Sequence, residues 1–352
     1  MENTKDKEVL FKIRNLKKYF PLKKKGIFDR SPQQYVHANE SISIDIYQGE
    51  TLGLVGESGC GKSTFGRTLL QIYDQTEGTT LYYGKTIEDV APEYMGKMIK
   101  NIPSQFPNYD KAKKELEDIY AELDRASTDD DRARANEKAM LKRSEIEENY
   151  LNMIRIAGGL LTSSDLNKVS KLLSDYYSVL KERALVLEDI EIFEEKLQMR
   201  SREWDSYYKE LENDSRYKEL IDKRAKLSKK VGEKYNAIED YRATLAQNPG
   251  FEELEKEKDN GIDLSKLNQE EMRRLRQDLQ MIFQDPYGSL DTKMTVGNII
   301  GEGVLGHDLF KSRKDKGYNE YIQETMEKCG LAPYFIHRYP HQFSGGQRQR
   351  IG

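Results

Sequence analysis

The sequence predicts an α/β fold that is interrupted by a long helical segment. Near the start, apolar and polar residues alternate with the period of two that half-buried strands show. Residues 51–73 then change from an apolar run, through a glycine-rich turn, to apolar residues at helical spacing. From residue 108 to residue 248 there is no proline, and charged residues are dense. These three observations indicate a strand, loop and helix unit followed by helices.

The first 94 residues are expected to form strands around one helix. Apolar residues alternate in "VLFKI" and in "SISIDI", which predicts two strands that each bury one face. The run "TLGLVG" predicts a further strand, which leads through a glycine-rich turn into a helix with Phe65, Leu69, Leu70 and Tyr73 at helical spacing. The stretch "TTLYYGKTI" predicts another short strand.

Residues 95–262 are expected to form long antiparallel helices. Between Pro107 and Pro249 glycine is limited to three positions, so helix breakers are nearly absent. We expect turns at "STDDD", "AGGLLTSSD" and "QNPG", with residues 162–164 offering N-caps to the next helix. The heptad pattern is too short and irregular for a sustained coiled coil. Two interpretations stay open: a solvated helical hairpin, or a docking arm for a partner.

The residues after this segment are expected to return to the α/β part of the fold. Asn268 and Glu271 resemble a capping box that opens a helix. The run "QMIF" predicts a short strand that leads to Gln284, and helices are expected from Val296 onward. The resulting division is 1–94, 95–262, 263–294 and 295–352.

Composition limits the classes of function. Hydrophobic residues make up 37% of the chain, enough for a sizeable core, and the net charge of -4 gives no basic excess for nucleic acid. The two cysteines, Cys60 and Cys329, lack metal-ligand spacing, as expected in a reducing cytosol. No signal peptide or membrane span is apparent, so we expect a cytoplasmic protein whose link to a membrane comes through a partner.

The stretch "GESGCGKST" fits the phosphate-binding pattern GxxxxGK[ST], and it lies between a predicted strand and helix as that pattern requires. Glycines let the backbone wrap a triphosphate, and the following helix presents a partial positive charge to it. Lys62 would neutralise the β and γ phosphates, and the Ser63 hydroxyl would hold Mg²⁺. Cys60 is interpreted as a small loop residue. The predicted nucleotide-binding set is Gly56, Glu57, Ser58, Gly59, Cys60, Gly61, Lys62, Ser63 and Thr64.

A family resemblance appears when three stretches are taken in order. "GESGCGKST", "MIFQDPYGSLD" and "FSGGQRQRIG" resemble the ATP-binding subunits of ABC transporters. With "NLKKYFP", they look most like subunits of bacterial oligopeptide and dipeptide importers, a branch that includes nickel importers. The resemblance implies a P-loop NTPase of the ABC ATPase type. Such a protein has an antiparallel β subdomain, a RecA-like core and a helical signature subdomain.

The resemblance also implies roles for residues outside the phosphate-binding motif. Gln284 would be the Q-loop glutamine, which contacts Mg²⁺ or the attacking water and is catalytic together with Lys62. Tyr19 would stack on adenine, with Phe20 as the alternative. The signature motif would bind the γ-phosphate held by the opposite subunit, and it comprises Ser344, Gly345, Gly346 and Gln347.

Two features depart from the family pattern. Lys62 and Gln284 lie much further apart than the family requires, which implies that the helical segment is an insertion. The Asp-Glu pair of Walker B and the switch histidine that should follow the signature are not in the sequence, because all four histidines precede Ser344. We therefore expect the ATPase core to be incomplete and Gly352 to be a truncation point.

Three functions remain under consideration. The first is an ATP- and Mg²⁺-dependent energy-coupling subunit of a peptide importer, on the inner face of the cell membrane. It would pair with a second ATPase subunit and two membrane permeases and, indirectly, with an extracellular peptide-binding protein. The second is a mechanical ATPase resembling chromosome-maintenance proteins; the position of Gln284 after the helical segment argues against it. The third is a nucleotide-binding protein that does not hydrolyse ATP.

Overall fold

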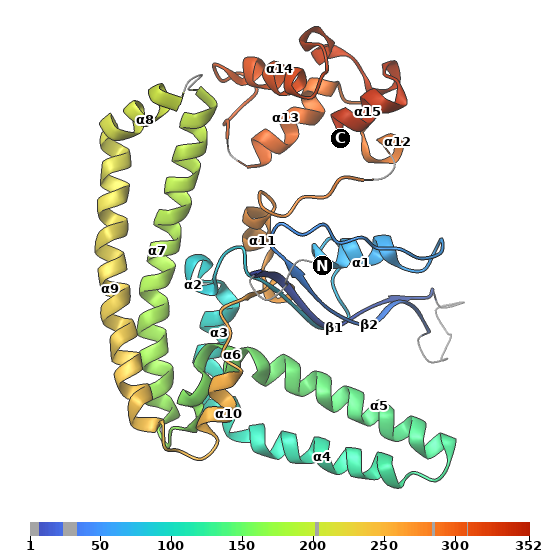
Figure 1. The fold of residues 1–352 in the computed structure, drawn as a ribbon, viewed down its shortest axis with the longest axis vertical. Helices are drawn as coiled ribbons and strands as arrows, with labels where there is room; N and C mark the ends of the chain where they lie inside the picture. The colour runs from blue at the N-terminus through green and yellow to red at the C-terminus, as the bar shows by residue number, and fades with distance from the viewer. Residues whose placement is uncertain (1–6, 24–33, 201–203, 284–285, 308) are drawn as a thin grey trace. The chain divides into compact units, whose positions relative to one another are not determined.

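The computed structural model describes residues 7–23, 34–200, 204–283, 286–307 and 309–352. The chain divides into two compact units, which are described separately (Figure 1). The first unit contains residues 1–184 and 227–272, and the second contains residues 185–226 and 273–352. The four-part division expected from the sequence stays a prediction.

The first unit contains a four-stranded antiparallel sheet in the order β2-β1-β3-β4. Its strands are β1 (Val9–Pro21), β2 (Tyr35–Tyr47), β3 (Glu77–Tyr82) and β4 (Ile262–Asp263). Ile13 of β1 pairs with Ile44 of β2 and with Thr80 of β3, and its side chain is fully buried. The strands predicted from "VLFKI" and "SISIDI" are therefore confirmed, and the strand predicted from "TTLYYGKTI" is confirmed over residues 79–82, because β3 ends at Tyr82.

Two predicted strands are wrong for the part of the chain that the structure describes. Residues 51–56 and 280–283 are irregular, with Val55 93% exposed and Ile282 86% exposed. A buried parallel strand needs hydrogen-bonded neighbours and helices on both faces. The described strands form only antiparallel pairs, so neither run has such neighbours, and the expected RecA-like parallel sheet is not formed by the described residues.

A helical segment, residues 83–261, connects β3 to β4. Because Tyr82 pairs with Ile262, both ends of this segment lie together at one edge of the sheet. Its first helix begins at Ile87, earlier than the expected start at residue 95. The α-helices are α2 (Ile87–Val90), α3 (Glu93–Gln105), α4 (Tyr109–Arg125), α5 (Asp129–Ile146), α6 (Asn152–Ala157), α7 (Leu166–Arg200), α8 (Trp204–Asn213), α9 (Ser215–Leu245) and α10 (Phe251–Lys256).

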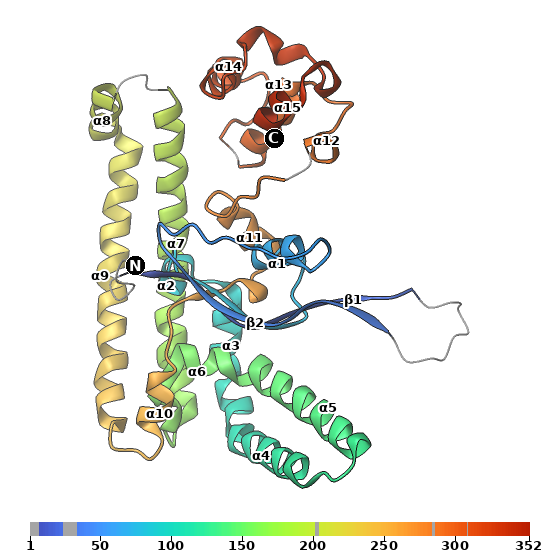
Figure 2. The ribbon, with the colours of Figure 1, turned by 45° about the vertical axis from the view of Figure 1, so that its right-hand side comes forward.

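These helices form antiparallel pairs, α4 with α5 and α7 with α9 (Figures 1 and 2). Within the first unit the rings of Tyr176 on α7 and Tyr235 on α9 lie 6.1 Å apart. The predicted turns at "AGGLLTSSD" and "QNPG" are confirmed, since no α-helix continues across them, and the break at "STDDD" is confirmed at residues 126–128, because α5 begins at Asp129 within it. The N-cap of α7 is not within residues 162–164 as predicted. It is Asp165, whose carboxylate accepts a hydrogen bond of 2.9 Å from the Lys168 amide.

A buried carboxylate joins the helical segment to the sheet. The side chain of Asp263 on β4 accepts hydrogen bonds from Ser265 Oγ (2.7 Å) and from Asn152 Nδ2 on α6 (3.1 Å). The Arg155 guanidinium lies 3.8 Å from the same carboxylate. The Asp263 amide donates to the Tyr94 hydroxyl on α3, and the burial of Tyr94 raises the pKa of that hydroxyl. One residue therefore contacts two helices of the helical segment, α3 and α6, and its own turn.

The second unit is mainly helical, as the sequence predicts from Val296 onward. It contains the C-terminal end of α11 (Gln269–Leu275), α12 (Pro286–Ser289), α13 (Val296–Gly306), α14 (Tyr318–Lys328) and α15 (Gly345–Ile351). Val296, Ile322 and Met326 are fully buried in its core. The predicted capping box of α11, which belongs to the first unit, is confirmed by hydrogen bonds of 2.9 and 3.0 Å between Asn268 and Glu271.

The substitution Asp263→Ala is expected to lower the free energy of unfolding by about 3 kcal/mol, because it leaves buried donors without an acceptor. The matched substitution Asp240→Ala, at an exposed carboxylate of α9, is expected to change it by less than about 0.5 kcal/mol. Urea unfolding followed by far-ultraviolet circular dichroism measures both. Equal losses in the two variants would contradict the structural role of Asp263.

Candidate nucleotide-binding site

The phosphate-binding motif, residues 56–64 and called the P-loop below, forms an exposed turn that leads into α1 (Lys62–Leu69). Gly56, Gly59 and Gly61 have φ angles of 153°, 83° and 95°. Residues with a Cβ atom rarely adopt these angles, so glycine is required at three positions of the turn. Backbone amides in such a turn can point toward one anion.

Strand β2 supports the end of the P-loop. A Cβ atom at Gly61 would collide with the carbonyl oxygen of Ala38 and lie 2.8 Å from Asn39 Nδ2. Asn39 donates a hydrogen bond of 3.2 Å to the Gly61 carbonyl, which also accepts a hydrogen bond of 2.8 Å from the Phe65 amide. The first turn of α1 is therefore fixed directly against β2.

The Lys62 ammonium group lies over the P-loop. Its Nζ atom donates hydrogen bonds to the carbonyls of Gly56 (2.8 Å) and Glu57 (2.7 Å) and lies 3.4 Å from Cys60 Sγ. The three partners belong to the loop itself, and no carboxylate is among them. Backbone carbonyls of the P-loop therefore hold the ammonium group over the loop.

Helix α1 is anchored on its opposite face and open at its first turn. Phe65 is 5% exposed and Thr68 is fully buried. Ser63 is exposed, and within the described part of the chain its hydroxyl has no hydrogen-bond partner. The hydroxyl oxygen could therefore serve as an Mg²⁺ ligand, which is the role that the sequence predicts for Ser63.

Tyr19 on β1 is part of a small polar and aromatic cluster with His37 and Glu40 of β2. Its ring stacks on the His37 ring with centroids 4.0 Å apart, and its hydroxyl donates to Glu40 at 2.6 Å. Burial and this hydrogen bond raise the pKa of the Tyr19 hydroxyl. Glu40 follows Asn39, so one stretch of β2 contacts Tyr19 through Glu40 and Gly61 through Asn39. The alternative residue, Phe20, instead packs edge-on against Tyr73.

The predicted signature residues belong to the second unit, at the start of α15. Ser344 Oγ accepts a hydrogen bond from the Gln347 amide (3.3 Å), and Gln347 Oε1 accepts one from the Ser344 amide (3.0 Å). A Cβ atom at Gly345 or Gly346 would meet no atom within 4 Å. The motif is therefore a capping box with an open surface over its two glycines.

The predicted Q-loop residue, Gln284, lies outside the described residues. Among the residues that the structure does describe, no three His, Cys, Asp or Glu side chains are grouped as metal ligands would be. In the same part of the chain, no helix combines the length and apolarity that crossing a bilayer demands.

The sequence did not predict the contribution of β2 to this site. Asn39 and His37 lie outside every motif, and alternation along "SISIDI" shows only which strand face is buried. Their contacts depend on the pairing of β1 with β2, which brings His37 opposite Tyr19. No local sequence signal reports that pairing.

Comparison with known proteins now places the chain in a class. The family model described as "ABC transporter" matches residues 39–237, more than half of the chain. The chain belongs to the ABC transporter family.

Individual relatives point to one branch of this family. The chain is similar to the oligopeptide transport ATP-binding protein AppF of Bacillus subtilis, 45% identical over 93 residues, which is 26% of this chain and 27% of AppF. It is also similar to the oligopeptide transport ATP-binding proteins OppF of Salmonella typhimurium, 48% identical over 92 residues, and of Escherichia coli, 47% identical over 92 residues. Each OppF match again covers 26% of this chain and 27% of the relative. The chain therefore spans about a quarter of the length of the curated relatives that it matches.

Gly61→Ala and Gly59→Ala form a matched pair that tests the P-loop geometry. Both replace a glycine with positive φ, which costs about 1–2 kcal/mol, but only Gly61→Ala also meets a backbone atom of β2. We expect the Phe65 amide, which donates to Gly61, to exchange its hydrogen faster in Gly61→Ala than in Gly59→Ala. Amide hydrogen exchange measures this, and equal rates in both variants would contradict the contact with β2.

Proposed function

We propose that this chain is the ATP-binding, energy-coupling subunit of an importer of oligopeptides or dipeptides, and that it hydrolyses ATP when its catalytic site is complete. The P-loop geometry carries the proposal, because three glycines with positive φ and a lysine ammonium lie within one short turn, an arrangement suited to a phosphate group. Family membership and the names of the relatives support the same function. Nickel import, the alternative within the branch, has no separate observation in its favour.

The residues of the site fit ATP with Mg²⁺. The backbone amides of the P-loop and the N-terminus of α1 would bind the phosphates. Lys62 would exchange its hydrogen bonds to the Gly56 and Glu57 carbonyls for phosphate oxygens. Ser63 would hold Mg²⁺, which supplies charge neutralisation between the β and γ phosphates. Tyr19 would offer adenine the ring face that His37 does not cover.

A complete catalytic site would need a second ATPase subunit, identical or paralogous. We propose that Ser344 and its neighbouring glycines contact the γ-phosphate held by that subunit, since the surface over Gly345 and Gly346 is open. Gln284 would contact Mg²⁺ or the attacking water. Two membrane permeases would receive the motion, an extracellular peptide-binding protein would deliver the peptide, and this subunit would act on the cytoplasmic face of the membrane.

The helical segment is proposed to be an insertion into the ATPase core. Its two ends meet at the Tyr82 and Ile262 pair, so the sheet continues across its base. In the second unit, the outer part of α7 also contacts the chain that leads toward residue 284. Arg274 lies 2.9 Å from Glu188, and Gln277 donates to Glu195 at 3.4 Å. These contacts favour a hairpin packed on its own protein, and a docking role stays an alternative.

The 352-residue chain alone is expected not to hydrolyse ATP. Its sequence contains no Asp-Glu pair to hold Mg²⁺ and to position water. Phosphate release by the purified chain should equal that of buffer. Phosphate release that disappears in Lys62→Ala but persists in the control Lys171→Ala, at an exposed lysine of α7, would overturn this prediction.

In cells that make this protein from its own gene, Lys62→Ala is expected to reduce the uptake of a labelled oligopeptide by about a hundredfold or more. The reason is the loss of the cation that stabilises the transferred phosphoryl group. Lys171→Ala serves as the control and should retain uptake. Uptake that survives Lys62→Ala would reject the energy-coupling role.

A further inference from the structure

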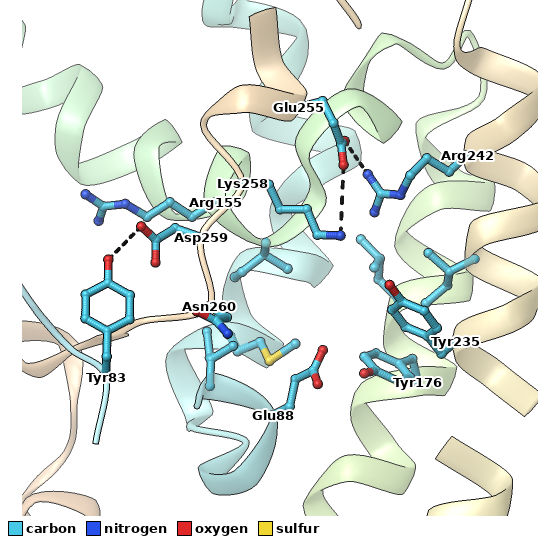
Figure 3. Close-up of a pocket in the computed structure, with 15 residues that line it drawn as sticks. Tyr83, Glu88, Arg155, Tyr176, Tyr235, Arg242, Glu255, Lys258, Asp259 and Asn260 are labelled. Carbon is cyan, nitrogen blue, oxygen red and sulfur yellow. Dashed lines mark hydrogen bonds and ion pairs between the residues drawn. The ribbon is translucent and has the colours of Figure 1, made fainter. Parts of the chain in front are cut away.

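A cavity of about 550 Å³ lies in the first unit at the base of the helical segment (Figure 3). Its lining comes from α2, α3, α6, α7, α9 and α10, with the chain on either side of the sheet edge at residues 83 and 258–260. No P-loop residue belongs to this lining. The volume falls within the range of small-molecule sites.

The cavity has an apolar part and an aromatic wall. Five aliphatic or thioether side chains line it: Ile87, Met95, Ile156, Leu173 and Ile238. Tyr176 and Tyr235 form a wall at which two helices meet, α7 and α9. An apolar side chain of a ligand would lose contact with water here without meeting an unpaired polar group.

One end of the cavity carries a cation that is only loosely paired. Glu255 forms an ion pair with Arg242 and accepts a hydrogen bond of 2.8 Å from the Gly159 amide. Arg242 also donates to Glu239 at 3.1 Å, so two carboxylates neutralise this arginine. Lys258 Nζ lies 3.9 Å from Glu255, beyond hydrogen-bond distance, and its ammonium is available to a ligand anion (Figure 3).

A carboxylate lies across the cavity from this lysine. Glu88 on α2 points into the cavity, on the side where Tyr176 lies (Figure 3). Burial and the charge of Glu88 raise the pKa of the Tyr176 hydroxyl, which therefore stays protonated. Among the described residues, no basic side chain forms an ion pair with the Glu88 carboxylate, so Glu88 is open to a ligand cation.

We propose that this cavity binds a small zwitterion, a free amino acid or a short peptide, with its carboxylate at Lys258 and its ammonium at Glu88. The apolar lining receives the side chain. This site is separate from the P-loop, and its occupancy does not depend on the function proposed above. Its lining charges balance, with Glu88, Glu255 and Asp259 against Arg155, Arg242 and Lys258, which matches a ligand without net charge.

The test is isothermal titration calorimetry of the 352-residue chain with leucine, Leu-Leu, N-acetyl-Leu-Leu and Leu-Leu amide. Leu-Leu is expected to bind at one site, and each capped derivative to bind about tenfold or more weakly, because it loses one charge. Leucine binding as tightly as Leu-Leu would assign the site to a free amino acid. The absence of binding by both leucine and Leu-Leu, or equal binding of the free and capped dipeptides, would overturn the proposal.

Two variants test whether Lys258 binds the ligand carboxylate and whether Glu88 binds the ligand ammonium. Lys258→Ala should remove the preference for Leu-Leu over Leu-Leu amide. Glu88→Gln should remove the preference for Leu-Leu over N-acetyl-Leu-Leu. The controls Lys256→Ala and Glu257→Gln change exposed neighbours outside the lining and should keep both preferences. If Lys258→Ala and Glu88→Gln keep the same preferences between free and capped dipeptides as the unchanged protein, the proposal is also overturned.

Two further measurements separate the outcomes. Thermal unfolding by circular dichroism shows whether Lys258→Ala and Glu88→Gln fold; if either variant does not, the capped ligands on the unchanged protein decide. Lys62→Ala should bind Leu-Leu with an unchanged dissociation constant, because Lys62 does not line the cavity. Failure of ATP binding and failure of dipeptide binding are therefore distinguishable.

Discussion

The buried carboxylate of Asp263 is the constraint on which the arrangement of the first unit depends. Strand β4 is only two residues long, so its pairing with β3 alone could hold little. Asp263 adds hydrogen bonds to α6 and to its own turn, and its amide contacts α3. Through these contacts a long helical segment leaves and rejoins the sheet at one place. The strands that support the P-loop and the walls of the zwitterion cavity are parts of the same unit.

The P-loop and the cavity suit ligands of different charge. At the P-loop, glycine conformations and a helix N-terminus would suit one strongly charged anion, and Lys62 would supply the balancing charge. In the cavity, Lys258 and Glu88 face each other across an apolar lining, which suits a neutral ligand with two opposite charges. A protein in which both sites act would combine nucleotide binding with recognition of a small solute.

Much of the fold could be predicted from the sequence because its signals are local. Alternation placed β1, β2 and β3, and the capping box of Asn268 and Glu271 marked the start of α11. The strand predictions at residues 51–56 and 280–283 were wrong. Apolar composition indicates burial, whereas a parallel strand also requires neighbouring strands, which the described residues do not provide. In the candidate site, the motif predicts Lys62 and Ser63, but the support from Asn39 and the stacking of His37 on Tyr19 arise from strand pairing.

The most direct measurement of the central claim is a titration of the 352-residue chain with MgATP, followed by backbone amide chemical shifts. The account predicts the largest changes at residues 56–64 and at residues 37–40 of β2, with smaller ones at the lining of the zwitterion cavity. Lys62→Ala should weaken binding by at least about tenfold. Saturable binding whose shifts leave residues 56–64 unchanged, or no binding at all, would contradict the claim that these residues form a nucleotide site.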